Sequence, residues 1–317
     1  MDPLTSKPFG NKFALIIPTR NRPEILLKLL GSIQMQDVLP DQTIIVDGSD
    51  LPIRSRIEAF FPDNTIYVHC FPPSLTKQRN AGLAHLDKNI TLIGYLDDDI
   101  ELEPAAVQAL LSFFETAPAD MGGASFNIIN VPPKKKLITF IRKLFLIDGD
   151  VPGKVLKSGF CTSIFPMDAD VDCNWLCGGA TVWRRELFKT FSFDEWFAGW
   201  AYHEDADFSY RVSKHYRLAG IHSAKVTHNP PPFNKTKQKQ LGMMAVINRY
   251  YFVTKNKELS VLFFFWASFG EILINILQSI RDLDGSGFLL AAGNITGLYR
   301  IIKGDMVQVD VNFRKQA

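Results

Sequence analysis

Ile93-Gly94-Tyr95-Leu96-Asp97-Asp98-Asp99 is an apolar run that ends in three consecutive aspartates. The run predicts a buried β-strand, and three like charges at its carboxyl end cost free energy unless a cation or hydrogen-bond donors compensate them. The oxygens of Asp97 and Asp99 suit Mg²⁺ or Mn²⁺ with a diphosphate, because these ions take few protein ligands and keep positions for phosphate oxygens. The alternative is a solvated acidic turn before a helix, favoured there by Glu101 and Glu103.

From Phe13 to about Ile128, short apolar runs alternate with longer amphipathic stretches. The predicted strands are Phe13–Ile17, Thr43–Val46, Thr65–Cys70, Thr91–Leu96 and Ala124–Ile128. The predicted helices are Pro23–Gln34, Ile53–Phe60, Leu75–Leu86 and Pro104–Glu115. This alternation predicts an α/β fold with a doubly wound, mostly parallel sheet.

Polar residues follow three of the predicted strands, at the edge where such sheets bind ligands. They are Pro18-Thr19-Arg20-Asn21, Asp47-Gly48-Ser49-Asp50 and the Asp97–Asp99 triplet. Their convergence on one edge is harder to explain by chance than any one of them alone.

Bulk properties exclude some classes of protein. The chain has 317 residues, 46% of them hydrophobic, and a net charge of +2, which gives no global attraction to nucleic acid. The few, irregularly spaced cysteines indicate reduced thiols in a cytosolic protein, and the first twelve residues contain no secretory signal. Cys173 and Cys177 lack a second pair of metal ligands, so we interpret them as structural thiols.

The second half of the chain divides into three parts. Residues 130–173 are irregular and rich in proline and glycine. An ordered block from Trp175 to Arg211 follows, and beyond Pro230–Pro232 the pattern becomes helical and apolar. We therefore expect a catalytic domain over residues 1–234 and a helical module over residues 235–317.

Set in order, these blocks resemble an inverting glycosyltransferase of the GT-A fold and family 2 type, similar to bacterial rhamnosyl and glycan-assembly transferases. The matching motifs run from about Phe13 to His228. They are Ile17-Pro18-Thr19-Arg20-Asn21-Arg22, Val46-Asp47-Gly48-Ser49, Arg79-Asn80-Ala81-Gly82, Asp97-Asp98-Asp99, Gly178-Gly179 with Arg184-Arg185, and Glu204-Asp205-Ala206-Asp207 with Arg211.

The resemblance implies a nucleotide-sugar site on the first three motifs. Pro18, Thr19 and Arg20 would lie against the nucleoside, and the Asp47 carboxylate can accept an imide N–H of the base; the alternative for Asp47 is a plain turn. Arg79 would place a cation near the base or diphosphate, unless it is an exposed surface arginine.

The resemblance also implies a metal site. Asp97 would contact the ribose and the metal, Asp99 would hold the metal, and Asp98 would support them or contact the ribose. His228 would complete the site, because Ala224 and Val226 place it on the same face of a predicted strand; His222 is the competing histidine. The Mn²⁺ or Mg²⁺ ion would stabilise the leaving diphosphate.

Asp205 is the predicted general base, at the start of a predicted helix, with Glu204 supporting it or touching the acceptor. The alternative for Asp205 is an N-capping residue. Trp200 and Tyr202 are the predicted acceptor-binding residues, because aromatic faces stack on sugar rings.

Two segments indicate contact with a membrane surface. Lys134–Phe145 carries five positive charges and no negative one, with Leu137, Ile141 and Leu144 on one helical face; an ordinary solvated helix is the alternative. Ser260–Ile280 is long enough to span a bilayer, but Glu271 within its polar stripe disfavours a span. With Arg300, Lys303, Arg314 and Lys315 nearby, we expect a peripheral protein on the cytoplasmic face of the cell membrane.

The expected activity is transfer of a sugar from a nucleotide-diphosphate donor to a glycan or lipid-linked acceptor. Two rivals remain. A sugar-1-phosphate nucleotidyltransferase needs a glycine-rich loop after the first strand, whereas Pro18–Pro23 contains no glycine. A non-catalytic nucleotide-sugar-binding protein at the membrane would keep Asp47 but have no use for Asp205.

Overall fold

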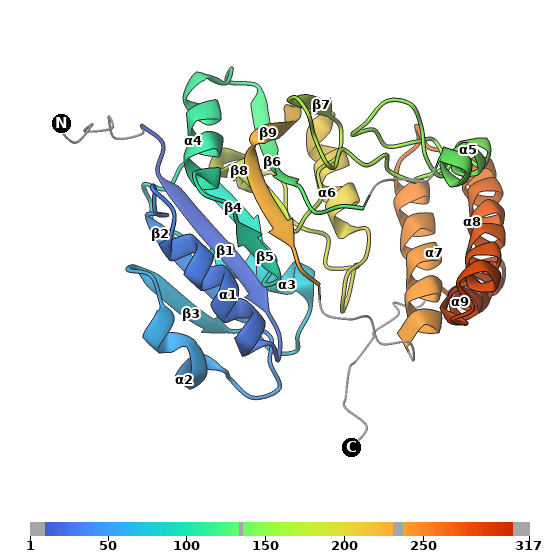
Figure 1. Ribbon diagram of the computed structural model, residues 1–317, viewed down its shortest axis with the longest axis horizontal. Helices are drawn as coiled ribbons and strands as arrows, with labels where there is room; N and C mark the ends of the chain where they lie inside the picture. Colours follow the sequence, from blue (N-terminus) through green and yellow to red (C-terminus); the bar gives the residue numbers. More distant parts are fainter. Residues whose placement is uncertain (1–9, 133–135, 231–236, 307–317) are drawn as a thin grey trace.

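The computed structural model describes residues 10–132, 136–230 and 237–306. It has an α/β core and, beside it, a bundle of C-terminal helices (Figure 1). The strands are β1 (Phe13–Thr19), β2 (Gln42–Asp47), β3 (Thr65–His69), β4 (Leu92–Leu96), β5 (Ile100–Leu102), β6 (Met121–Ile128), β7 (Val171–Cys173), β8 (Ala180–Arg184) and β9 (Arg217–His228). The helices of the core are α1 (Pro23–Gln34), α2 (Arg54–Ile57), α3 (Leu75–Leu83), α4 (Ala106–Thr116) and α6 (Glu204–Ser213), with short 3₁₀ turns at Glu58–Phe60 and Arg185–Lys189. The C-terminal helices are α7 (Gln238–Lys255), α8 (Val261–Asp282) and α9 (Ser286–Ile302). Helix α5 (Lys136–Leu144) lies beside α8, away from the sheet (Figure 1).

The strands form one sheet in the order β3-β2-β1-β4-β8-β6-β9-β5, and β7 also pairs with β9. The first four strands are parallel, which confirms the predicted doubly wound half. The predicted strand at Ala124–Ile128 is present within β6. β8 was not predicted as a strand; it lies antiparallel between β4 and β6.

Both faces of the parallel half are buried, which explains its continuous apolar runs. Successive residues of β1 point to opposite faces. Phe13, Leu15 and Ile17 pack in a core with α1 and α4, whereas Ala14 and Ile16 pack in a second core to which α6 contributes. The two cores fix the positions of the strand ends, and therefore of any site built on them.

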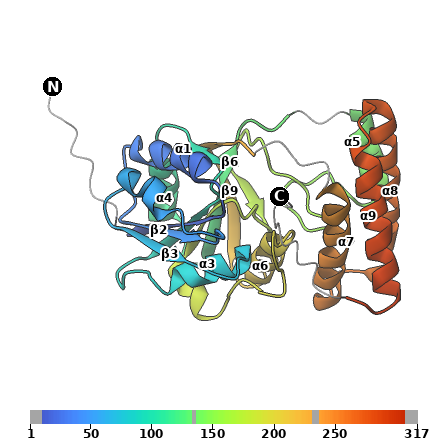
Figure 2. The same cartoon turned by 90° about the horizontal axis from the view of Figure 1, so that it is seen from below.

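The C-terminal helices form a further layer beyond α6 (Figure 2). α7 lies between the α/β core and the pair formed by α8 and α9. Glycines allow very close contact between α7 and α9: a Cβ on Gly242 would lie 2.3 Å from the backbone oxygen of Leu290. The bundle therefore depends on small residues as well as on its apolar core.

α8 differs from the amphipathic helices of most soluble proteins, because its polar side faces the protein and its apolar side faces outward. Its polar stripe points toward α7 and α9: Ser268 is fully buried, Glu271 pairs with Arg249, and Asn275 donates to Asn294 over 2.9 Å. Its apolar residues on the other side are exposed, among them Leu262, Trp266, Phe269, Leu277 and Ile280. By length and composition, α8 is the helix of the described residues that could cross a membrane.

The close contact of α7 with α9 yields a prediction. Gly242→Ala should lower the free energy of unfolding by about 1–3 kcal/mol, because the added methyl group meets rigid backbone. Gly31→Ala in α1 is the matched control, since nothing lies within 4 Å of its Cβ position, and it should stabilise by up to about 1 kcal/mol through helix propensity. Urea unfolding measures both. Equal stability of the two variants would contradict the predicted clash.

Candidate active site

The carboxyl ends of β1, β2 and β4 meet at one edge of the sheet, as the sequence predicted. Thr19 Oγ1 donates to Asp98 Oδ2 over 2.7 Å, which ties the end of β1 to the acidic triplet. Asp98 is only 4% exposed. Burial raises the pKa of Asp98 to about 7, although Arg22 and the bond from Thr19 oppose this shift. Asp98 thus points into the protein and holds the first loop to β4.

Asp99 and His228 lie together at the ends of β4 and β9. His228 Nε2 is 3.2 Å from the buried oxygen Asp99 Oδ1, and within the described residues Oδ1 has no hydrogen-bond partner other than this ring. Two ligands of an octahedral ion, each at about 2.1 Å from it, are separated by roughly 3 Å. The pair therefore fits a shared Mg²⁺ or Mn²⁺ ion. His222, the competing histidine, instead contacts the Met167 carbonyl oxygen at 2.6 Å.

Asp99 and His228 shift each other's pKa. Burial raises the pKa of Asp99, but the His228 ring and Arg22 outweigh burial, so the pKa lies below its ordinary value. The contact with Asp99 raises the pKa of His228. Among the described residues, no three His, Cys, Asp or Glu side chains form a ready metal cluster. An ion here would take its other ligands from water and phosphate, as Mg²⁺ usually does.

Asp97 faces a different cation from Asp99. Arg79, on α3, donates from Nη2 to Asp97 Oδ1 over 2.9 Å and from Nη1 to Glu204. Arg79 is 1% exposed, which excludes the alternative of a surface arginine, and both of its terminal nitrogens are engaged by protein carboxylates. Burial raises the pKa of Glu204 to about 8, while the charge of Arg79 opposes that rise. Arg79 thus links the predicted donor side to the predicted base.

Asp205 lies in the first turn of α6, after His203 in the left-handed conformation at φ 80°. Its Oδ2 accepts from the Gly178 N–H over 3.0 Å and its Oδ1 accepts from the Ala206 N–H over 2.8 Å. The N-cap residue of α6 is His203, so Asp205 does not occupy the capping position itself. The bond from Ala206 is local to the helix, whereas the bond from Gly178 comes from the loop before β8. Burial raises the pKa of Asp205, against the two backbone bonds.

Gly178 and Gly179 allow the two sides of the site to approach. A Cβ on Gly178 would lie 2.7 Å from Arg79 Nη1 and 2.8 Å from Asp205 Cβ. A Cβ on Gly179 would lie 2.7 Å from Asp97 Oδ2. Larger residues here would separate Arg79 from its carboxylates.

The predicted nucleoside-binding residues border the first two strand ends. Pro18 and Asp47 are buried. The Asp47 carboxylate accepts from Ser49 N over 2.8 Å, from Ile53 N over 3.0 Å and from the hydroxyl of Tyr67. Arg20 pairs with Asp50 at 3.1 Å. Asp47 therefore shapes its own turn, the alternative stated above, and its contact with a base stays a prediction.

The predicted acceptor residues lie in the loop before α6. Trp200 is 37% exposed and Tyr202 is 44% exposed, so both rings are accessible. The ring of Trp196, in the same loop, instead stacks on the ring of Tyr251 of α7, with the ring centroids 3.7 Å apart.

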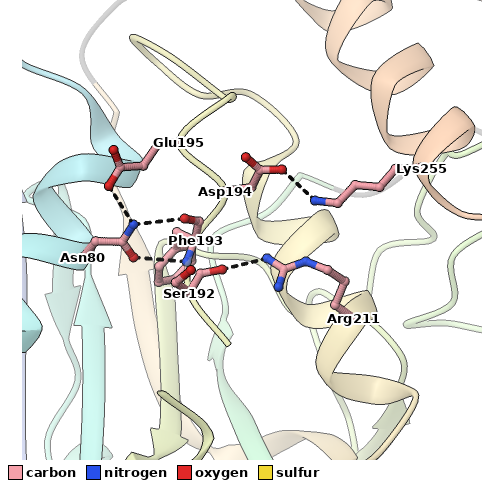
Figure 3. A pocket seen from close by; sticks show the side chains of 7 residues that line it. All are labelled: Asn80, Ser192, Phe193, Asp194, Glu195, Arg211 and Lys255. Atoms are coloured by element: carbon pink, nitrogen blue, oxygen red, sulfur yellow. Dashed lines mark hydrogen bonds and ion pairs between the residues drawn. The ribbon is translucent and has the colours of Figure 1, made fainter. Parts of the chain in front are cut away.

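A hollow beside this loop is lined by Asn80, Ser192, Phe193, Asp194, Glu195, Arg211 and Lys255 (Figure 3). Its charged groups contact one another: Lys255 donates to Asp194 over 2.7 Å, and Arg211 donates to the Ser192 carbonyl oxygen over 2.8 Å. Lys255 and Arg211 also pair with the fully buried Asp207. These contacts around the hollow join α6 to α7. Asp207 acts there as a structural ion-pair partner.

Two contacts had no role in the sequence-based interpretation, one at the site and one between α7 and α8. Arg22 belongs to the first motif, and its Nη1 lies 3.1 Å from Asp98 Oδ1 and 3.3 Å from Asp99 Oδ2. Arg249 of α7 is buried and forms a bidentate pair with Glu271. The sequence held one sign of the pair between Arg249 and Glu271, because a carboxylate in an apolar helix requires a partner.

Comparisons with known proteins identify the family. Residues 14–171 match the model described as Glycosyl transferase family 2, and through this half the chain belongs to that family. No curated protein matches the chain in sequence.

Solved structures similar to this one include two glycosyltransferases. A mannosyltransferase, PcManGT from Pyrobaculum calidifontis, in complex with GDP-Man and Mn²⁺, aligns at 13% identity and a TM-score of 0.58 over 92% of this chain and 91% of that chain. Glucosyl-3-phosphoglycerate synthase from Mycobacterium tuberculosis, in complex with Mn²⁺, UDP and phosphoglyceric acid, aligns at 15% identity and 0.52 over 77% and 79%. These likenesses confirm the GT-A fold.

The buried position of Arg79 yields a second prediction. Arg79→Met should destabilise the protein by about 3–5 kcal/mol, because Glu204, whose pKa burial already raises, must then either keep an uncompensated buried charge or take up a proton. The double variant Arg79→Met with Glu204→Gln should regain part of this loss. Urea unfolding of wild type, both single variants and the double variant measures the coupling. Strictly additive losses would show that the two side chains do not interact.

Proposed function

We propose that the protein is a metal-dependent inverting glycosyltransferase that moves one sugar from a nucleotide-diphosphate donor to a glycan or lipid-linked glycan. The observation that carries the proposal is the pairing of the buried oxygen Asp99 Oδ1 with His228 Nε2 at 3.2 Å, at the strand ends of a GT-A fold. The two similar structures named above contain Mn²⁺ with GDP-Man or UDP, so Mn²⁺ or Mg²⁺ is the proposed ion. The nucleotide base stays open.

In the proposed mechanism, one set of carboxylates binds the ion and the donor, and a second set serves the acceptor. Asp99 and His228 would hold the ion, and Asp97 would contact the ribose and the ion while Arg79 fixes its orientation. Pro18, Thr19, Arg20 and Asp47 would border the nucleoside, and the buried Asp98 would support the loop that carries Thr19 and Arg20. The bound ion would stabilise negative charge on the departing diphosphate.

Asp205 is the proposed general base on the acceptor side. It would take the proton of the acceptor hydroxyl as the hydroxyl oxygen bonds to the anomeric carbon and the bond from that carbon to the diphosphate breaks. Its two backbone bonds hold the carboxylate in one orientation, and its raised pKa favours proton transfer. Glu204 would support it through Arg79, and the exposed rings of Trp200 and Tyr202 would stack on the acceptor.

The outward apolar face of the C-terminal module supports peripheral attachment to a membrane. α5 continues this face: Phe140 is 68% exposed and Leu144 is 59% exposed, and Phe145 contacts Trp266 of α8 with ring centroids 4.9 Å apart. Arg142 adds positive charge on α5, whereas the charge of Lys143 is paired with Asp150. Lys134 and Lys135 of the basic segment lie outside the described residues, as do Arg314 and Lys315.

A membrane-bound enzyme of this kind would act on a lipid-linked acceptor at the cytoplasmic face. The four cysteines are free thiols, which suits the cytosol. We keep the division at residues 234 and 235 as a proposal, with the helical module as the membrane-facing part.

For metal binding, Asp99→Ala should abolish divalent-dependent nucleotide binding, and His228→Ala should weaken metal affinity without unfolding the protein. Calorimetry with Mn²⁺ and either UDP or GDP measures this. Asp63→Ala, which removes an exposed carboxylate before β3, is the control and should bind as wild type does. Wild-type Mn²⁺ affinity in Asp99→Ala would rule out the proposed ligand.

For the chemical step, Asp205→Asn should leave donor binding nearly intact and lower the transfer rate by about 10²–10⁴-fold, as expected for loss of a general base. Glu204→Gln should lower it less. Single-turnover transfer with saturating donor separates this effect from binding. Near-normal turnover in Asp205→Asn would contradict the assigned role.

For attachment, binding to anionic vesicles should fall when Lys134, Lys135, Lys136, Arg142 and Lys143 are neutralised, since each contributes about 1 kcal/mol near such a surface. It should fall further with Leu262→Ser and Phe269→Ser, whose side chains are exposed. Leu51→Ser is the matched control, with an 80% exposed side chain on the α/β core. If the wild type stayed wholly in the supernatant after sedimentation with anionic vesicles at low salt, attachment would be refuted.

A further inference from the structure

Arg22 contacts two of the three aspartates through a single nitrogen. It precedes α1 at the N-cap position, and Nη1 reaches Asp98 Oδ1 at 3.1 Å and Asp99 Oδ2 at 3.3 Å. Its side chain is 35% exposed, whereas those of Asp98 and Asp99 are 5% and 10% exposed. One guanidinium thus joins the loop after β1 to the end of β4.

The two oxygens of Asp99 have different surroundings. Oδ2 faces Arg22, whereas Oδ1 faces His228 and has no other hydrogen-bond partner within the described residues. The terminal torsion of an aspartate is broad and weakly restrained by itself. Holding one oxygen therefore fixes where the other oxygen points.

We propose that Arg22 is a positioning residue for the divalent metal: by holding Oδ2 of Asp99 it presents Oδ1, together with His228 Nε2, to the ion. This inference rests on the metal use stated under the proposed function. Residues that orient metal ligands commonly change metal affinity by 10–100-fold when they are replaced.

A purely electrostatic role for Arg22 makes the opposite prediction. A cation beside Asp98 and Asp99 repels Mn²⁺, so its removal would tighten metal binding. The geometry favours positioning, because Arg22 leaves free the oxygen that faces His228. The sign of the change in affinity therefore separates the two roles.

The test is Mn²⁺ affinity, by calorimetry and by the paramagnetic resonance signal of free Mn²⁺, with and without UDP or GDP. Arg22→Met should weaken Mn²⁺ binding by about 10–100-fold. Arg22→Lys should restore part of it, since one nitrogen makes both contacts and an ammonium group retains the charge and the donors. Circular dichroism and metal-free thermal unfolding check that each variant is folded.

Arg56→Gln is the matched control, because Arg56 pairs with Glu24 of α1 on the exposed surface, and its Mn²⁺ affinity should equal that of the wild type. Unchanged or tighter Mn²⁺ binding in Arg22→Met would overturn the positioning role. If Arg22→Met does not fold, wild-type or tighter affinity in Arg22→Lys would overturn it, because the shorter side chain cannot hold Oδ2 as closely. Failure of the wild type to bind Mn²⁺ would instead count against the proposed function.

Discussion

The crowding of three carboxyl groups at the carboxyl end of β4 is the constraint on which the rest of the site depends. Asp97 lies against Arg79, Asp98 against Thr19, and Asp99 against His228, while Arg22 contacts both Asp98 and Asp99. These partners come from the end of β1 and the loop after it, from α3 and from β9. Compensation of the triplet therefore draws together the elements that line the edge of the sheet.

The parallel half of the fold could be predicted because its signals are local. The alternation of apolar runs and amphipathic stretches placed the strands of this half and gave α1 its bounds at Pro23 and Gln34. β8 could not be found in the same way, because it begins after Gly178-Gly179 and is defined by pairing with β4 and β6, which are distant in sequence. Its antiparallel insertion brings the diglycine between Asp97 and Asp205.

Much of the site composition was visible in the sequence, but the partnerships within it were not. The motif around Arg79 predicted a cation near the donor, whereas its burial between Asp97 and Glu204 follows from the packing of α3 against the sheet. Asp207 was indistinguishable by spacing from a catalytic carboxylate, and only its contacts with Arg211 and Lys255 show a structural role. For α8, periodicity defined the polar stripe but not the direction it faces, which is set by Arg249 and Asn294 on the neighbouring helices.

The central claim is that this edge of the sheet binds a nucleoside diphosphate through a divalent cation. The most direct measurement is thermal unfolding of the wild-type protein with UDP, GDP, ADP, CDP or TDP, each with and without Mn²⁺. A ligand that binds only the folded state raises Tm, and the account predicts that at least one of the five does so in the presence of Mn²⁺ and much less in its absence. No shift with any of them, with Mn²⁺ or with Mg²⁺ in its place, would contradict the account.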